Sequence, residues 1–280
     1  MMALYAFDGT WNKNEPDDGA DTNVVKFAEA YTEETCYLPG VGTRMGKLGK
    51  VVGGAFGAGS QQRLEEMLRE LRQNYEAGDK TVDVIGFSRG AAIALDFANL
   101  VNEKLNAAPI RFLGLWDTVA SFGLPGNEIN LGHRLTLPDN VQHCFHAMSL
   151  DERRGNFPLT RVVPCQGGKP AAGRVEEVWF RGVHSDVGGG KSIGLSSIAL
   201  VWMLRRGLSC GLPINLSDLA KHESNRDPLA PISKNFDPMA DPKREIATAD
   251  LVHDSVAPRG HANGRDHNDP PAACKVATDA

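Results

Sequence analysis

A run of apolar and β-branched residues leads directly into a glycine-flanked serine and then into an alanine-rich stretch. The run is Thr81–Phe87, the serine lies in Gly86-Phe87-Ser88-Arg89-Gly90, and the alanine-rich stretch is Gly90–Val101. This order predicts a buried strand, a tight turn and a helix, which is the context that the pattern G-x-S-x-G requires. In such a turn the hydroxyl of Ser88 projects at the N-terminus of the helix, where the helix dipole favours negative charge.

Strand-like and helix-like segments alternate along the rest of the chain. Further strands are predicted at Leu4–Phe7, Thr35–Leu38, Ile110–Trp116, Val178–Val183 and Ile246–Val252. Further helices are predicted at Asn23–Tyr31, Gln61–Asn74 and Ser196–Arg206. This alternation predicts the α/β class, with an α/β-hydrolase-like, mostly parallel sheet and helices on both faces. We expect one catalytic domain over residues 1–256 with a cap within residues 120–173, followed by a polar tail over residues 257–280.

The composition argues against several functional classes. Hydrophobic residues make up 41% and charged residues 23% of the 280 residues, which is typical of a soluble globular protein. The formal net charge of −5 offers no basic face for nucleic acid. The five cysteines form no CxxC pair, so the sequence predicts neither a structural zinc site nor a disulfide framework. We find no signal peptide and no transmembrane segment, and expect synthesis in the cytoplasm.

A serine hydroxyl becomes a strong nucleophile only with a histidine base that a carboxylate orients. Asp117 and Asp186 each follow a predicted strand, and His184 and His253 are the candidate bases. In α/β-hydrolases the chain order is serine, acid, histidine. Two assignments keep that order, and we favour Ser88–Asp186–His253, with Ser88–Asp117–His184 as the alternative. Neither assignment requires a metal ion or an organic cofactor.

Backbone amides near Ser88 are the candidate donors to the oxyanion that forms during acyl transfer. The amide of Arg89 follows the serine at the start of the predicted helix, and the turn at Gly9 and Thr10 follows the first predicted strand. These are the two places from which α/β-hydrolases usually supply such donors. We therefore predict that Arg89, Gly9 and Thr10 form the oxyanion site.

With these residues in view, the chain resembles a known family, the α/β-hydrolase catalytic domain of type VI secretion phospholipase effectors, long catalogued as a domain of unknown function. The resemblance runs in order over roughly residues 3–256. Its segments are Phe7-Asp8-Gly9-Thr10-Trp11-Asn12, Pro39-Gly40-Val41-Gly42-Thr43, Gly78-Asp79, Gly86-Phe87-Ser88-Arg89-Gly90-Ala91, Trp116-Asp117-Thr118-Val119, Asp151-Glu152-Arg153-Arg154, Trp179 to Gly190 and His253-Asp254-Ser255.

The resemblance implies a Ser-Asp-His esterase that hydrolyses phospholipid acyl esters as an antibacterial effector. It also implies a secretion-apparatus carrier, an immunity protein as a further partner, and export by a type VI system into a target cell. Two other functions stay open from the sequence. One is hydrolysis of small esters or thioesters without a membrane role, and the other is a non-catalytic binding module on a hydrolase fold.

Overall fold

Parallel strands form the centre of the computed structural model, which describes residues 3–9, 21–40, 50–51, 60–120, 134–155, 157–164, 173–234, 243–259 and 267–279. Within these residues nine strands make one sheet in the order β11-β10-β9-β7-β5-β4-β1-β2-β3, and each neighbouring pair is parallel. The strands are β1 (Ala3–Phe7), β2 (Glu34–Leu38), β3 (Lys50–Val51), β4 (Val82–Phe87), β5 (Ile110–Trp116), β7 (Val141–Ser149), β9 (Val175–Phe180), β10 (Leu251–His253) and β11 (Lys275–Ala277). Two short strands, β6 (Thr136–Leu137) and β8 (Val163–Pro164), pair separately.

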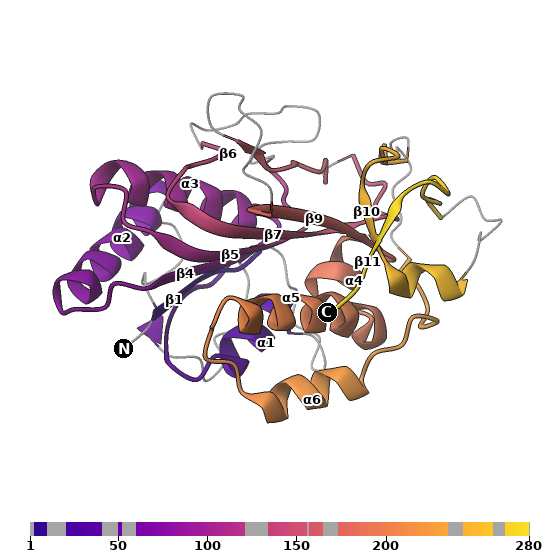
Figure 1. Cartoon of the computed structure of the whole chain (residues 1–280), viewed down its shortest axis with the longest axis horizontal. Helices are drawn as coiled ribbons and strands as arrows, with labels where there is room; N and C mark the ends of the chain where they lie inside the picture. Colours follow the sequence, from indigo (N-terminus) through magenta and orange to yellow (C-terminus); the bar gives the residue numbers. More distant parts are fainter. Residues whose placement is uncertain are drawn as a thin grey trace.

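Helices cover both faces of the sheet (Figure 1). One face carries α2 (Ser60–Glu76) and α3 (Arg89–Lys104). The other carries α1 (Asn23–Ala30), α5 (Ile193–Ser209) and α6 (Leu216–Ser224). The short helix α4 (His184–Gly188) and a 3-10 helix (Asp254–Arg259) follow β9 and β10. This arrangement confirms the predicted α/β class with a parallel sheet.

The side chains of β1 alternate between two hydrophobic cores. Leu4 and Ala6 belong to the core under α1 and α5, whereas Tyr5 and Phe7 belong to the core under α2 and α3. A parallel strand that is buried on both faces has to be apolar along its whole length, as β1 is. The neighbouring strand β4 is also buried throughout. The loops that follow these two central strands therefore meet at one edge of the sheet.

Two glycines let α3 begin in direct contact with the ends of β1 and β4. A Cβ atom on Gly90 would lie 2.3 Å from the carbonyl oxygen of Phe7, and one on Gly86 would lie 2.7 Å from Cα of Ala91. Both distances are too short for any side chain, so the glycines of the G-x-S-x-G pattern are required by packing. They fix the position of Ser88 between strand and helix.

The middle of the expected cap, Val141–Ser149, is a central strand of the sheet. It pairs with β5 on one side and β9 on the other, which corrects the predicted cap over this stretch. The sequence Val141-Gln142-His143-Cys144-Phe145-His146 looks too polar for a buried strand. His146 is nevertheless fully buried because Glu177 of β9 contacts its ring nitrogen Nδ1 at 3.0 Å.

The expected polar tail also contributes to the sheet. Lys275–Ala277 form β11, parallel to β10, so this part of the tail is ordered at the sheet edge. The strand is too short to give a signal in the sequence. Contacts hold it instead: His253 Nε2 lies 3.1 Å from Asp279 Oδ1, and Arg206 donates to the carbonyl oxygen of Thr278 at 3.0 Å.

In the described part of the chain, no helix combines the length and the apolar character needed to cross a membrane.

Gly90→Ala should lower the free energy of unfolding by about 1–3 kcal/mol, because its Cβ would overlap the backbone of β1. Urea denaturation of the purified protein measures this loss. Gly207→Ala is the matched control in α5, where the nearest atoms to a new Cβ lie at 3.3 Å. The control should change stability by about 1 kcal/mol or less. Equal effects of the two substitutions would contradict the packing argument.

Candidate active site

Ser88 occupies a strained turn between β4 and α3. Its φ of 59° lies in the left-handed region that non-glycine residues rarely adopt. Hydrogen bonds hold it there, because its amide donates to Trp116 O at 3.0 Å and its carbonyl oxygen accepts from Val119 N at 3.2 Å. Its hydroxyl oxygen is buried and has no hydrogen-bond partner among the described residues. Strain that the surroundings maintain is typical of catalytic residues.

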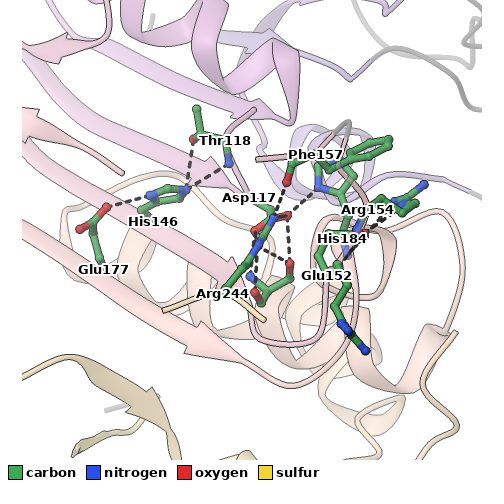
Figure 2. A network of polar contacts seen from close by, with 11 residues as sticks. Asp117, Thr118, His146, Glu152, Arg154, Phe157, Glu177, His184 and Arg244 are labelled. Atoms are coloured by element: carbon green, nitrogen blue, oxygen red, sulfur yellow. Dashed lines mark hydrogen bonds and ion pairs between the residues drawn. The ribbon is translucent and has the colours of Figure 1, made fainter. Parts of the chain in front are cut away.

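Asp117 follows β5 and has the same kind of backbone, with a φ of 40°. Its amide donates to Ala147 O of β7 at 2.8 Å, and its carboxylate accepts from the amide of Ser149 at 2.8 Å. His184 Nδ1 lies 2.6 Å from Asp117 Oδ2, and the guanidinium of Arg244 lies 2.6 Å from Oδ1 (Figure 2). Burial by itself would raise the pKa of Asp117, but the charge of Arg244 and the hydrogen bonds from His184 and Arg244 hold it well below the usual range.

His184 is the first residue of α4, and only Arg181, Gly182 and Val183 separate it from the end of β9. Its ring packs against that of Phe87, the residue before Ser88, with ring centroids 4.6 Å apart, and against that of Phe157 at 4.8 Å. Its backbone amide donates to Glu152 Oε2 at 3.1 Å. Burial lowers the pKa of His184, and the contact with Asp117 offsets part of that effect. A neutral imidazole that donates from Nδ1 to Asp117 has its lone pair on Nε2, as a general base requires.

The structure does not bring together Asp186 and His253, the acid and the base of the assignment that the sequence favoured. The Asp186 carboxylate accepts from Val183 N at 3.1 Å and from the hydroxyl of Ser233 at 2.5 Å. His253 instead contacts Ser255 Oγ at 2.8 Å through Nδ1 and Asp279 Oδ1 at 3.1 Å through Nε2. The geometry therefore favours the alternative, Asp117 with His184, over Asp186 with His253.

A local signal in the sequence could have separated the two acids. Asp186 is the third residue of α4, and an acid at that position commonly accepts the amide that precedes the helix, here that of Val183. Asp117 follows its strand, and the described residues 118–120 after it form no helix. The capping role gives Asp186 a structural use that Asp117 lacks.

The predicted oxyanion residues lie at the same edge. A Cβ on Gly9 would lie 3.1 Å from Ser88 Cβ, so the turn after β1 does reach the serine. The amide of Gly9 itself donates to Asp8 Oδ1 at 2.7 Å. Arg89 is the first residue of α3. Thr10 lies outside the described residues.

Asp8 anchors the turn that carries Gly9. Its other oxygen, Oδ2, accepts from Tyr37 Oη at 2.6 Å and from Thr22 Oγ1 at 2.8 Å. Burial raises the pKa of Asp8 to about 6, although these hydrogen bonds and that from Gly9 oppose the rise. The turn beside Ser88 thus rests on a buried carboxyl group that titrates within a unit or so of neutral pH.

A second buried histidine supports the loop that carries Asp117. The amide of Thr118 donates to His146 Nε2 at 3.2 Å, and His146 Nδ1 lies 3.0 Å from Glu177 Oε1 (Figure 2). Nε2 must accept in this arrangement, so the ring is neutral and donates from Nδ1 to the carboxylate. Neither this pair nor Arg244 was expected from the sequence. For His146, the available signal was the presence of polar residues within an otherwise apolar strand. No feature of the sequence marked Arg244.

A cluster of three side chains that could bind a metal ion lies away from Ser88. Glu34, Cys36 and Glu70 offer ligand atoms within 4.8 Å of one another. Glu34 starts β2 and therefore lies at the amino end of the strands, whereas Ser88 follows the carboxyl end of β4. This group is not part of the candidate active site.

Comparison with known proteins identifies the family. The family model described as the T6SS (type VI secretion system) phospholipase effector Tle1-like catalytic domain matches residues 4–105 and 99–206, well over half of the chain. The chain belongs to this family. The match confirms the resemblance found in the sequence. No curated protein matches the chain.

One of the matching solved structures shares the fold of this chain, and two others match it more weakly. A crystal structure of an uncharacterized protein from Pseudomonas aeruginosa is 24% identical, with a TM-score of 0.55, over 80% of this chain and 48% of that one. A Tle1 effector bound to the VgrG spike of the type VI secretion system is 22% identical, with a TM-score of 0.43, over 69% of this chain and 52% of that one. A Vlm2 thioesterase domain is 12% identical, with a TM-score of 0.37, over 76% and 95%. The chain thus spans about half the length of the first two proteins.

In this member of the Tle1-like family, the substitution Asp8→Asn should change how the free energy of unfolding depends on pH, because the pKa of Asp8 is raised in the folded protein. The ordinary pKa of an aspartate is near 3.8, so the folded wild type loses stability relative to the variant as the pH rises from about 4 to about 6. The unfolding free energy of the variant minus that of the wild type should increase by roughly 2–3 kcal/mol between pH 4 and pH 7. Urea denaturation at four pH values measures the trend. Asp139→Asn, at a side chain that is 87% exposed, is the control, and equal trends would contradict the role of Asp8.

Proposed function

We propose that the chain is a serine hydrolase that cleaves carboxylic esters, with Ser88 as nucleophile, His184 as general base and Asp117 as the group that orients His184. The observation that carries this proposal is the 2.6 Å contact between His184 Nδ1 and Asp117 Oδ2, with the His184 ring packed beside Phe87. The strained backbone of Ser88 and its buried, unpartnered hydroxyl support the same roles. In structures without substrate, the bond between nucleophile and base is often long and shortens only when substrate binds.

The reaction follows from these positions. His184 Nε2 takes the proton of the Ser88 hydroxyl as the oxygen attacks the carbonyl carbon of the ester. The tetrahedral intermediate collapses when the alkoxide leaving group takes the proton from His184, which leaves the acyl group on Ser88. Water then attacks the acyl-enzyme and loses a proton to His184, and His184 passes that proton to the departing Ser88 oxygen as the carboxylic acid leaves. Asp117 keeps its negative charge throughout and stabilises the transient imidazolium.

The amide of Arg89, at the start of α3, is the proposed main donor to the oxyanion. It lies next to Ser88 at the N-terminus of a helix of 16 residues, where the helix dipole also favours negative charge. The Gly9 amide donates to Asp8, so the turn after β1 contributes by packing against Ser88. A donor of this kind is worth about 10²–10³-fold in turnover.

Membership of the Tle1-like family supports phospholipid acyl esters as the substrate class. The same membership supports delivery by a type VI secretion system through a carrier, and an antibacterial role for the lipid hydrolysis. Short soluble esters or thioesters are the competing substrate class, and a comparison of phospholipid vesicles with short chromogenic esters separates the two.

Substitution of the two candidate pairs tests the assignment. Ser88→Ala should lower ester turnover by about 10⁴-fold or more. His184→Ala and Asp117→Asn should each lower it by about 10³–10⁴-fold, because the base or its orientation is lost. His253→Ala and Asp186→Asn should stay within about tenfold of the wild type, since neither side chain contacts Ser88, Asp117 or His184 in the described structure.

Each variant needs a check of its fold, because His253 and Asp186 hold the chain together at β10 and α4. Circular dichroism at the assay temperature provides this check. Activity loss in folded His253→Ala with retention in His184→Ala would contradict the proposal and restore the other assignment. Full activity of Ser88→Ala, or no reaction of the wild type with any ester or with a fluorophosphonate, would contradict the serine-hydrolase mechanism itself.

A further inference from the structure

Arg244 reaches the acid of the proposed triad from a distant part of the chain. Its Nη1 atom donates to Asp117 Oδ1 at 2.6 Å, and its Nη2 atom lies 3.2 Å from Asp117 Oδ2. The guanidinium also donates to the carbonyl oxygen of Ser149 at 2.8 Å and to that of Phe157 at 3.0 Å. The side chain is 9% exposed, so these bonds form away from bulk water. A buried two-pronged contact of this kind is stronger and more specific than a surface ion pair.

We infer that Arg244 is a positioning residue for the proposed hydrolysis. Arg244 shares the Asp117 carboxylate with His184, and it weakens the attraction between that carboxylate and the imidazole proton. This inference rests on the proposed function, because it assigns Arg244 a role through Asp117 and His184. Arg244 itself contacts neither Ser88 nor the imidazole in the described structure. It acts on the reaction only through the carboxylate.

The charges around His184 give the direction of the effect. Asp117 and Glu152 favour the charged imidazole, whereas burial and Arg154 oppose it. Arg244 contacts both oxygens of the Asp117 carboxylate, and its positive charge helps to keep the pKa of Asp117 low. Without Arg244, His184 would face a buried carboxylate with no other cation on it among the described residues. The pKa of His184 would then rise, because a nearby uncompensated negative charge favours the protonated ring.

Arg244 also fixes the ring that covers His184. Its bond to the carbonyl oxygen of Phe157 holds the residue whose ring lies 4.8 Å from the imidazole. The guanidinium of Arg154 lies 3.7 Å from the centroid of the same ring, and Glu152 binds both Arg154 and the His184 amide. Arg244 thus contacts both Asp117, the proposed acid, and Phe157, whose ring packs against the proposed base His184.

Arg244 lies far along the sequence from the other residues of the site, outside the part of the chain that matches the family model. The family match ends at residue 206, and Arg244 lies in the stretch from 243 onward, between α6 and β10. Its carbonyl oxygen accepts from Asn268 Nδ2 at 2.8 Å, which ties this stretch to the segment before β11. The C-terminal part of the chain therefore takes part in the site through the side chain of Arg244.

The pH dependence of fluorophosphonate labelling of Ser88 tests the role, because the labelling rate requires neutral His184 but not the true substrate. In Arg244→Gln we expect the acidic limb of the rate profile to move to higher pH by about one unit. In Arg244→Lys the charge remains but cannot reach both carboxylate oxygens, so we expect an acidic limb close to that of the wild type and a plateau rate about tenfold lower.

Arg111→Gln is the matched control. Arg111 donates to both oxygens of buried Asp83, at 3.0 and 2.6 Å, at the opposite end of β4 from Ser88. Its loss removes the same kind of buried ion pair and should reduce stability, yet leave the acidic limb where it is in the wild type. A shift in Arg111→Gln equal to that in Arg244→Gln would overturn the inference.

The remaining outcomes are also decisive. An acidic limb that is unchanged or moves to lower pH in folded Arg244→Gln overturns the inference. Where Arg244→Gln does not fold, Arg244→Lys decides: an unchanged plateau, or a limb shifted by a full unit, overturns it. Failure of the wild type to label at any pH contradicts the proposed function itself, which is a different result from normal labelling with no effect of Arg244.

Discussion

Two strained backbone positions at the carboxyl edge of one parallel sheet determine the rest of the site. Ser88 and Asp117 both have positive φ, and direct hydrogen bonds join their loops: Ser88 N donates to Trp116 O, and Val119 N donates to Ser88 O. Each conformation costs energy by itself, so it persists only where the surroundings maintain it. Central strands that are buried on both faces, together with glycines that allow helix and strand to touch, provide those surroundings.

The carboxylate of Asp117 is the electrostatic centre of this edge. It binds a histidine, an arginine and the amide of Ser149 from three different parts of the chain. A buried carboxylate with this many donors stays ionised, and its charge is available to orient His184 without accepting its proton. Two further acidic side chains have different tasks. Asp8 supports the turn beside Ser88, and Glu177 holds the histidine that positions Thr118.

The sequence predicted the parts of this arrangement that depend on local order. The strand, turn and helix around Ser88 follow from apolar runs and glycines, and the alternation of elements indicated a parallel sheet. The partners of Ser88 could not be chosen in the same way, because both acids follow strands and both histidines keep the required chain order. Long-range contacts make the difference: Asp186 caps its own helix and binds Ser233, and His253 binds Asp279 near the end of the chain. Strand β7 was missed because its buried polar side chain, His146, finds its partner Glu177 only in the folded protein.

The central proposal is that His184, oriented by Asp117, acts as the general base for Ser88. A crystal structure of the protein after reaction with a fluorophosphonate tests it most directly. We expect phosphorus bonded to Ser88 Oγ and a phosphoryl oxygen within hydrogen-bond distance of the Arg89 amide. We also expect His184 Nε2 to be the nearest imidazole nitrogen to the adduct, with Asp117 still bound to Nδ1. An adduct on another residue, or His253 in place of His184 beside Ser88, would contradict it.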